Sequence, residues 1–267
     1  MTKRFLAFAL AIILCLSLTV PAFAAESERK ETWETMEEWE AMFADFPYTG
    51  EWPTDLLGVA KTQVGYMESM EDRRIGWDKN QHGYTRYSHW FNWQFYGEER
   101  PLGPYEWWCA DFVSFCLHYA GVPAEYMPAD YNCQRMANAL DASGYYRPYY
   151  GTSDGFSYTP KAGDIIFFDY ENDGYIDHVG IVSEYEETKE VNGKLQPALI
   201  HTIEGNVNFQ VMEREYTYWH DIIVGFGDTQ AAYDDYINDI YTSVQNMIQE
   251  ANVEQTDNAP TITEGDQ

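Results

Sequence analysis

A cysteine at the start of a predicted helix is the best-placed nucleophile in this sequence. Cys109 follows an aromatic segment and opens an apolar helical one. There the thiol points at the positive end of the helix dipole and at unpaired backbone N–H groups, and both favour the thiolate. Cys116 lies further along the same segment, and we interpret it as a buried structural cysteine. Position alone does not separate these two roles, so the interpretation depends on a partner for Cys109.

A histidine and an acid complete a nucleophilic site if two predicted strands pair as a hairpin. His178 begins one apolar strand, and Asn192-Gly193 marks a turn before the next. Around that turn facing residues have numbers that sum to roughly 385, which brings Glu204 and Asn206 within one or two pairs of His178. Alternation places Glu204 and Asn206 on one face and His201 on the other. A thiol, an imidazole and a group that holds the imidazole are the nucleophile, base and orienting residue of acyl transfer.

Helical periodicity precedes strand periodicity along the chain. Thr54 is placed to cap a helix over residues 54–65, and the helix that begins at Cys109 ends at Gly121. From Gly163 onward the period is that of strands, which we expect at 164–169, 178–183, 198–203, 211–217 and 222–226. Helices followed by antiparallel strands predict an α+β domain.

The two ends of the chain differ from this central part. Residues 1–24 read as a secretory signal, with Lys3 and Arg4 before an apolar run and Ala22-Phe23-Ala24 as the cleavage site. An uncleaved anchor is the alternative, but the run is shorter than the roughly 20 residues of a membrane helix. We predict an exported protein, with no membrane association after cleavage. The predicted parts are the signal 1–24, an acidic amphipathic leader 25–53, the catalytic domain 54–227, an amphipathic helix 228–250 and a disordered acidic tail 251–267.

The apolar residues of the C-terminal helix are spaced four and three residues apart. They are Tyr233, Ile237, Ile240, Val244 and Met247. This pattern is typical of a partner-binding seam or of a helix that packs on its own domain, and we prefer the second interpretation because the pattern is short. The sequence does not indicate an oligomeric state.

Charge and aromatic content restrict the classes of partner. The formal net charge is -28, from 16 Lys plus Arg against 44 Asp plus Glu. The charge therefore disfavours binding to nucleic acid or to an acidic membrane surface through a basic field, and we expect neither as a partner. The rings crowded into residues 84–108 could stack on sugars, but we prefer packing in the core and a lid.

Signal removal leaves Cys109, Cys116 and Cys133, an odd number in an exported chain. At least one thiol then stays unpaired. A disulfide between Cys116 and Cys133 is one alternative. We expect free buried thiols, because Cys116 belongs to the apolar stripe of its helix.

Four segments in order resemble the CHAP family of cysteine- and histidine-dependent amidohydrolases and peptidases. They are residues 106–114 (EWWCADFVS), 160–168 (PKAGDIIFF), 177–182 (DHVGIV) and 203–206 (IEGN). Residues 59–66 (VAKTQVGY) look like the lead-in helix of secreted Gram-positive members, so the resemblance covers about 54–227. It implies a papain-like fold in which Cys109 is the nucleophile, His178 the base, Glu204 its orienting residue and Asn206 a further polar member.

The resemblance implies a secreted peptidoglycan hydrolase that cleaves amide bonds, as an N-acetylmuramoyl-L-alanine amidase or as an endopeptidase of the stem or cross-bridge. Two features differ from many wall lytic enzymes: no wall-binding repeat is recognisable, and the negative charge opposes anionic wall polymers. An NlpC-type peptidase is one alternative, although its third polar residue is most often a second histidine. A non-catalytic surface module that binds glycan is the other.

No cofactor is required by this chemistry, and calcium is the one ion for which the sequence offers ligands. Asp169, Glu171, Asp173 and Asp177 stand at the spacing of carboxylates in an oxygen-ligand calcium loop, with Gly174 at its turn. The twelfth position is Gly180 where such loops have a bidentate Glu. A solvated acidic turn is the alternative, and it is the simpler one in so acidic a chain. The other histidines show no metal-ligand spacing; they are His82, His89, His118, His201 and His220.

Overall fold

The structure, a computed structural model, describes residues 33–76, 78–96, 105–149 and 158–257. Contacts divide the chain into two units, 1–34 and 35–267, and the account below concerns the second. The predicted signal 1–24 lies outside the described residues, as do 25–32 of the leader and 258–267 of the tail.

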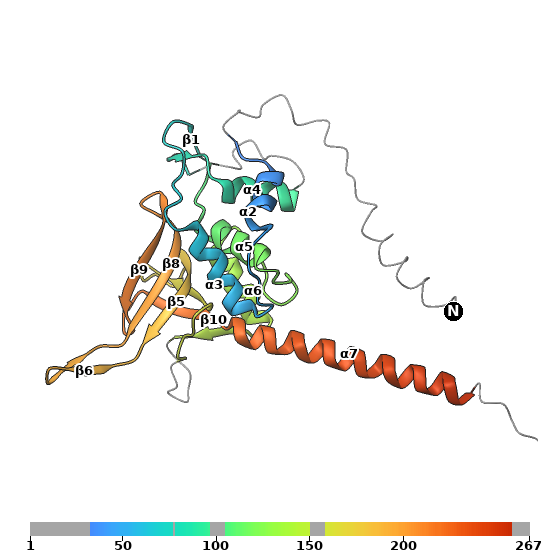
Figure 1. The fold of residues 1–267 in the computed structure, drawn as a ribbon. Coiled ribbons are helices and arrows are strands. Elements are labelled where there is room, and N and C mark those ends of the chain that lie inside the picture. The colour runs from blue at the N-terminus through green and yellow to red at the C-terminus, as the bar shows by residue number, and fades with distance from the viewer. Residues whose placement is uncertain (1–32, 77, 97–104, 150–157, 258–267) are drawn as a thin grey trace, which may run out of the picture. The chain divides into compact units, whose positions relative to one another are not determined.

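Helices dominate the first part of this unit and strands the second, so the fold is α+β as predicted (Figure 1). The helices are α2 (Met36–Phe43), α3 (Trp52–Gln63), α4 (Arg86–Tyr96), α5 (Cys109–Tyr119), α6 (Cys133–Ala142) and α7 (Thr229–Asp257). The strands are β1 (Arg73–Ile75), β2 (Gln81–Gly83), β3 (Tyr146–Pro148), β4 (Ile165–Phe168), β5 (His178–Glu186), β6 (Lys189–Val191), β7 (Lys194–Gln196), β8 (Leu199–Val207), β9 (Gln210–Thr217) and β10 (Ile223–Gly227).

An antiparallel sheet in the order β3-β10-β4-β5-β8-β9 forms the centre of the domain. Its two outer edges approach each other. Tyr149, which follows β3, donates a hydrogen bond to the carbonyl of Tyr218, which follows β9. The sheet is therefore curled, and it encloses a core of its own between Ile166, Phe168, Val182, Ile200 and Phe226.

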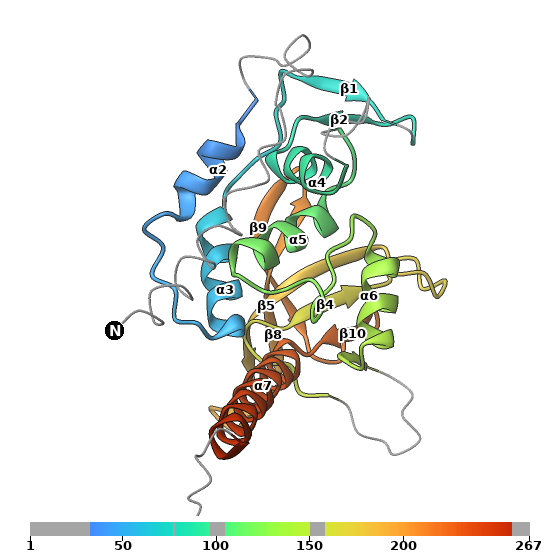
Figure 2. The same ribbon diagram turned by 90° about the vertical axis from the view of Figure 1, so that its right-hand side faces the viewer.

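The other face of the sheet carries the helices, with α3, α5 and α6 on one side of the strands (Figure 2). We predicted a one-sided apolar stripe for α5. The helix is instead enclosed on all sides, because every side chain except His118 is buried. Strands β5 and β8 pack on one side of α5, and α3 and α4 pack on others. A helix held in this way is a rigid platform for its first residue, Cys109.

The predicted hairpin register is confirmed in the pairing of β5 with β8. Asn192 and Gly193 have φ values of 54° and 73°, the left-handed conformation that a tight turn between β6 and β7 requires. Glu184 then faces His201, and an irregularity between Val182 and Glu184 shifts the register by one residue toward His178.

Other details differ from the sequence-based expectations. Helix α3 begins at Trp52, so Thr54 lies inside it, and its N-cap Glu51 makes no side-chain capping bond. Asp55 lies in the first turn of α3 and accepts hydrogen bonds from Thr49 and Gly50. Helix α6 and strand β3 were not predicted. Most rings of 84–108 that the structure describes are buried, in agreement with the packing interpretation.

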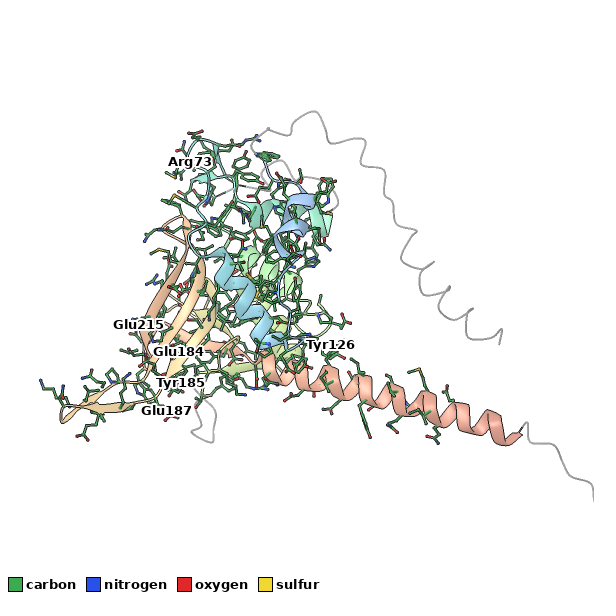
Figure 3. All side chains as sticks on the ribbon, viewed as in Figure 1. Arg73, Tyr126, Glu184, Tyr185, Glu187 and Glu215 are labelled. Atoms are coloured by element: carbon green, nitrogen blue, oxygen red, sulfur yellow. The ribbon has the colours of Figure 1, made fainter. Side chains whose placement is uncertain are left out.

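The structure contradicts our expectation that the C-terminal helix α7 packs along its length on its own domain. Tyr233 and Tyr236 pack on Trp52 of α3, and Tyr126 also lies beside this first part of the helix (Figure 3). From Ile237 onward the described side chains of α7 are exposed, so most of the predicted seam is not buried against the residues that the structure describes. The helix also runs to Asp257, into the segment predicted as a disordered tail. None of the helices that the structure describes combines the length and apolar character needed to cross a membrane.

Candidate active site

Cys109 is the first residue of α5, and it is 6% exposed. The N-cap Trp108 makes no side-chain capping bond, so the first amides of the helix are left to act on the thiol. Trp108 is itself fixed, because its indole Nε1 donates to Glu68 Oε2 at 3.2 Å and its ring stacks on Tyr87 at 5.3 Å. The start of the helix, and with it the sulfur, is held in place by these contacts.

The His178 ring at the start of β5 is bonded to Glu204 of β8. Its Nε2 lies 2.9 Å from Glu204 Oε2, which leaves Nδ1 as the ring atom free to serve Cys109. Glu204 is fully buried and accepts two further bonds, from Thr202 Oγ1 at 2.5 Å and from the Tyr216 hydroxyl at 3.3 Å. A carboxylate with three donors cannot turn away from the ring, so the orientation of the imidazole is set.

Two glycines make this geometry sterically possible. A Cβ at Gly180 would lie 2.6 Å from Cγ of Glu204, so the glycine makes room for the Glu204 side chain to reach His178. A Cβ at Gly205 would lie 2.6 Å from Cβ of Phe112, so that glycine lets β8 close against α5. Strand and helix can therefore bring His178 and Cys109 to one place.

The charges of this site stabilise an ion pair. A hydrogen bond from Cys133 and the charge of His178 lower the pKa of Cys109 well below its ordinary 9.0, against the effect of burial. Burial alone would lower the pKa of His178, but the Cys109 thiolate and Glu204 raise it to about 9. Both shifts favour a thiolate and an imidazolium, the form in which a cysteine attacks a carbonyl.

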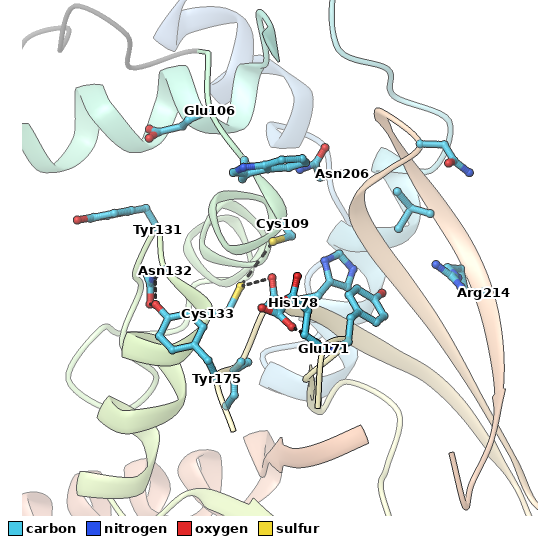
Figure 4. A pocket seen from close by; sticks show the side chains of 16 residues that line it. Glu106, Cys109, Tyr131, Asn132, Cys133, Glu171, Tyr175, His178, Asn206 and Arg214 are labelled. Atoms are coloured by element: carbon cyan, nitrogen blue, oxygen red, sulfur yellow. Dashed lines mark hydrogen bonds between the residues drawn. The ribbon is translucent and has the colours of Figure 1, made fainter. Parts of the chain in front are cut away.

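A pocket of about 670 Å³ opens over this pair (Figure 4). Cys109, His178, Cys133 and Asn206 are all part of its lining, whereas Glu204 lies behind the imidazole. Asn206 has a φ of 62° and stands where the pairing of β8 with β9 is irregular, so the strict alternation that we expected stops before it. Asn206 consequently turns to the pocket and not to the side of Glu204.

Residues 101–206 match the family model of the CHAP domain, and the match includes Cys109, His178, Glu204 and Asn206. The chain carries a CHAP domain. No curated protein matches the chain, and no solved structure does. CHAP domains are typically cysteine- and histidine-dependent amidohydrolases, and the family acts on peptidoglycan.

Cys133 lies beside Cys109, a position that we did not predict from the sequence. It is the first residue of α6, its Sγ lies 3.5 Å from Sγ of Cys109, and it contacts the Asp177 carbonyl at 3.7 Å. A signal for this helix was present, since Asn132 is a good N-cap and the apolar residues Cys133, Met136, Ala137 and Leu140 follow with helical spacing. The spatial pairing of the two sulfurs had no signal in the sequence.

The acidic loop beside the CHAP site is a hydrogen-bonded turn. Asp169 accepts from the backbone N–H groups of Asp173 and Gly174, and Asp177 accepts from those of Tyr170 and Glu171. Across the described ranges no three His, Cys, Asp or Glu side chains are arranged to hold a metal ion. These bonds shape the loop as a turn, and calcium binding by Asp169, Glu171, Asp173 and Asp177 stays a prediction.

Three of the remaining histidines are bonded to partners other than Cys109. His201 is bonded to Glu186 on the same hairpin, His82 to Asp78 and His89 to the Tyr84 hydroxyl. Since His201 does not approach His178, the polar partner of the imidazole is a carboxylate and not a second histidine. This arrangement separates the site from the NlpC-type alternative.

Proposed function

We propose that the protein is an exported peptidoglycan hydrolase that cleaves an amide bond with Cys109 as its nucleophile. The observation that carries this proposal is the thiol of Cys109 at a helix start beside an imidazole oriented by Glu204, inside a CHAP domain and in an open pocket. Signal residues 1–24 supply the argument for export.

The geometry supports a two-step acyl transfer. The Cys109 thiolate attacks the carbonyl carbon, and the Cys109 backbone N–H at the start of α5 stabilises the oxyanion. His178 gives its proton to the leaving nitrogen, which departs as an amine and leaves a thioester. The neutral imidazole then takes a proton from water, the hydroxide attacks the thioester, and Cys109 is released as thiolate. Glu204 holds the ring throughout and stabilises its charged form.

The lining of the pocket suits a peptide that carries charges of both signs. Trp107, Tyr170 and Tyr175 present half-exposed rings, which can pack on the aliphatic parts of a stem peptide or on sugar faces. Three acidic residues, Glu106, Glu171 and Asp177, line the pocket together with Arg214, the one lysine or arginine among the described residues of this lining. A stem peptide has free carboxylates for the arginine and, where it ends in a diamino acid, an amine for the acids.

Hydrolysis of purified wall material tests the proposal. Wild type and Cys116→Ala should solubilise peptidoglycan, whereas Cys109→Ala should have no measurable activity and an unchanged far-UV spectrum. Cys116 is the matched control because it is a buried cysteine on the same helix. Wild-type turnover in Cys109→Ala contradicts the proposal, and binding to walls without hydrolysis by all three proteins indicates the glycan-binding alternative.

Mass spectrometry of the digested wall identifies the bond. Free stem peptides detached from the sugar mark an amidase, and new peptide termini on sugar-linked stems mark an endopeptidase. N-terminal sequencing of the exported protein tests cleavage after Ala24.

A further inference from the structure

A second thiol lies beside the proposed nucleophile. Sγ of Cys133 lies 3.5 Å from Sγ of Cys109, and both are free. We propose that Cys109 and Cys133 form a reversible disulfide when the protein meets a two-electron oxidant of the peroxide class, and that this bond closes the active site. The bond itself depends on the geometry alone; its effect on activity rests on the proposed function.

The approach of the two sulfurs is built by the fold. The cap Asn132 fixes the start of α6 by accepting from the Arg135 N–H at 2.9 Å. Asp130, two residues before this cap, is bonded to Ser114 of α5: its carbonyl accepts from the Ser114 hydroxyl at 2.9 Å, and its N–H donates to that hydroxyl at 3.1 Å. These bonds tie the start of α6 to α5, which carries Cys109. A disulfide needs an S–S distance of about 2.05 Å, so roughly 1.5 Å of closure remains.

A small oxidant can reach both sulfurs, because each is part of the pocket lining (Figure 4). They differ in reactivity. The low pKa of Cys109 makes it the thiolate that attacks, whereas the hydrogen bond with Cys109 and burial raise the pKa of Cys133. Cys116 is fully buried, is not in the pocket lining, and has a pKa raised by burial. It is therefore the thiol that should stay unreacted.

The chemistry balances with hydrogen peroxide as the oxidant. The Cys109 thiolate attacks one peroxide oxygen, the O–O bond breaks, and hydroxide leaves, so that Cys109 becomes a sulfenic acid. Cys133 then attacks the Cys109 sulfur. Its proton and the sulfenic hydroxyl leave together as water, and the S–S bond forms. A dithiol reductant returns both thiols by exchange.

This pairing would protect the nucleophile as well as block it. A sulfenic acid that finds no thiol is oxidised further to sulfinic acid, which is not reversed by thiols. With Cys133 beside it, the sulfenic acid has an intramolecular partner at once. Peroxide inactivation should accordingly be recoverable in the wild type and permanent without Cys133.

Peptide mapping after peroxide treatment tests the bond directly. Trypsin leaves all three cysteines on the single peptide 87–135, because Arg100 precedes Pro101. Cleavage before aspartate separates them into 78–110, 111–129 and 130–140. After alkylation under denaturing, non-reducing conditions, we expect 78–110 linked to 130–140 and 111–129 carrying the alkyl group. No crosslink, or one that includes 111–129, overturns the proposal.

Variants separate the bond from the function. Cys116→Ala should form the same crosslink as wild type. Cys133→Ala and Cys133→Ser should form none, accumulate sulfinic acid on 78–110, and regain less than a tenth of their wall hydrolysis after dithiothreitol, whereas wild type regains nearly all. Equal recovery in wild type and Cys133→Ala overturns the proposal. A crosslink in a protein that hydrolyses no wall even when reduced supports the disulfide and rejects the proposed function.

Discussion

His178 lies between two negative partners, Cys109 on one side and Glu204 on the other. The imidazolium is stable only while both remain charged, and the thiolate in turn depends on the imidazolium. The pH dependence of the reaction therefore reports both contacts of His178, the one with Cys109 and the one with the fully buried Glu204.

We predict that activity falls on the alkaline side near pH 9. The pKa of His178 is raised to about 9, so the imidazolium is complete below this pH and is lost as pH rises through it. The lowered pKa of Cys109 means that its thiolate persists to lower pH than that of an ordinary cysteine. Glu204→Gln keeps an acceptor but loses a charge, so its alkaline limb should move down toward the ordinary 6.5 of histidine.

The measurement is kcat/KM against pH for the wild type and for Glu204→Gln. The rate at which iodoacetate alkylates Cys109 is measured over the same pH range, because it reports the thiolate without any wall substrate. We expect partial activity in Glu204→Gln because an amide oxygen can still orient the ring. An alkaline limb that stays near pH 9 in the variant would show that Glu204 does not set the charge of His178.

Residue types and spacing were enough to predict that Cys109, His178 and Glu204 lie together, because each belongs to an element with a clear period. Cys133 was not found, since nothing in the local sequence shows that the start of α6 lies against the start of α5. That contact depends on hydrogen bonds between Ser114 and Asp130, which are 16 residues apart and carry no local pattern that would indicate their pairing.

At the scale of elements, strand β5 can present His178 to Cys109 of α5 only because β5 has a glycine at one position. Gly180 has no side chain where Glu204 passes under His178. We predict that Gly180→Ala, whose Cβ would lie 2.6 Å from Glu204 Cγ, displaces the carboxylate and lowers kcat. The expected loss is about 10- to 100-fold, since displacements of about 1 Å at a catalytic group cost that much.

The control for this variant is Gly193→Ala in the β6–β7 turn, where φ is 73° and a side chain meets no other atom. It should lower the melting temperature through backbone strain while the folded enzyme keeps its kcat. Loss of kcat in both variants, or in neither, would show that Gly180 has no special relation to Glu204.

The strands and their register could be predicted because a turn and a two-residue period fix them together. The Asn192-Gly193 turn predicted the pairing of β5 with β8 to within one residue. The one-residue shift near Ser183 was not predicted. Periodicity could not predict what covers a helix. It marked one stripe on α5, which is buried on all sides, and it marked a seam on α7, which is mostly exposed.

We predict that the exposed part of α7 adds little to the stability of the domain. A chain ended after Ile240 keeps the Tyr236 ring on Trp52 at 4.6 Å and the Tyr126 hydroxyl on Asp239 at 2.6 Å. Its free energy of unfolding should stay within about 0.5 kcal/mol of the full chain. Tyr236→Ala should cost more, about 1 kcal/mol or above, because it removes the stacked pair.

Denaturant unfolding of the three proteins decides this point. If truncation destabilises the domain as much as Tyr236→Ala does, the outer turns of α7 pack on the domain in solution. That result would restore our sequence-based expectation and contradict the prediction made from the exposed side chains.

At the scale of the whole molecule, the dominant property is the net charge of -28. Glu184, Glu187 and Glu215 are among the side chains that carry it on and beside the sheet (Figure 3). An anionic wall polymer would repel such a protein over about a Debye length, roughly 10 Å at 0.1 M salt. Short-range recognition in the pocket would have to work against this repulsion.

We therefore predict that added salt increases hydrolysis of walls that retain their anionic polymers. Screening weakens the long-range repulsion, and the contacts inside the pocket are screened much less. The rate should rise severalfold between about 10 and 150 mM NaCl, ionic strengths over which the Debye length falls from about 30 to 8 Å. Walls stripped of anionic polymers by acid are the matched control and should show little change. A rate that falls with salt on both substrates would mean that attraction, through a cationic group of the wall and the acidic surface of the protein, brings the two together.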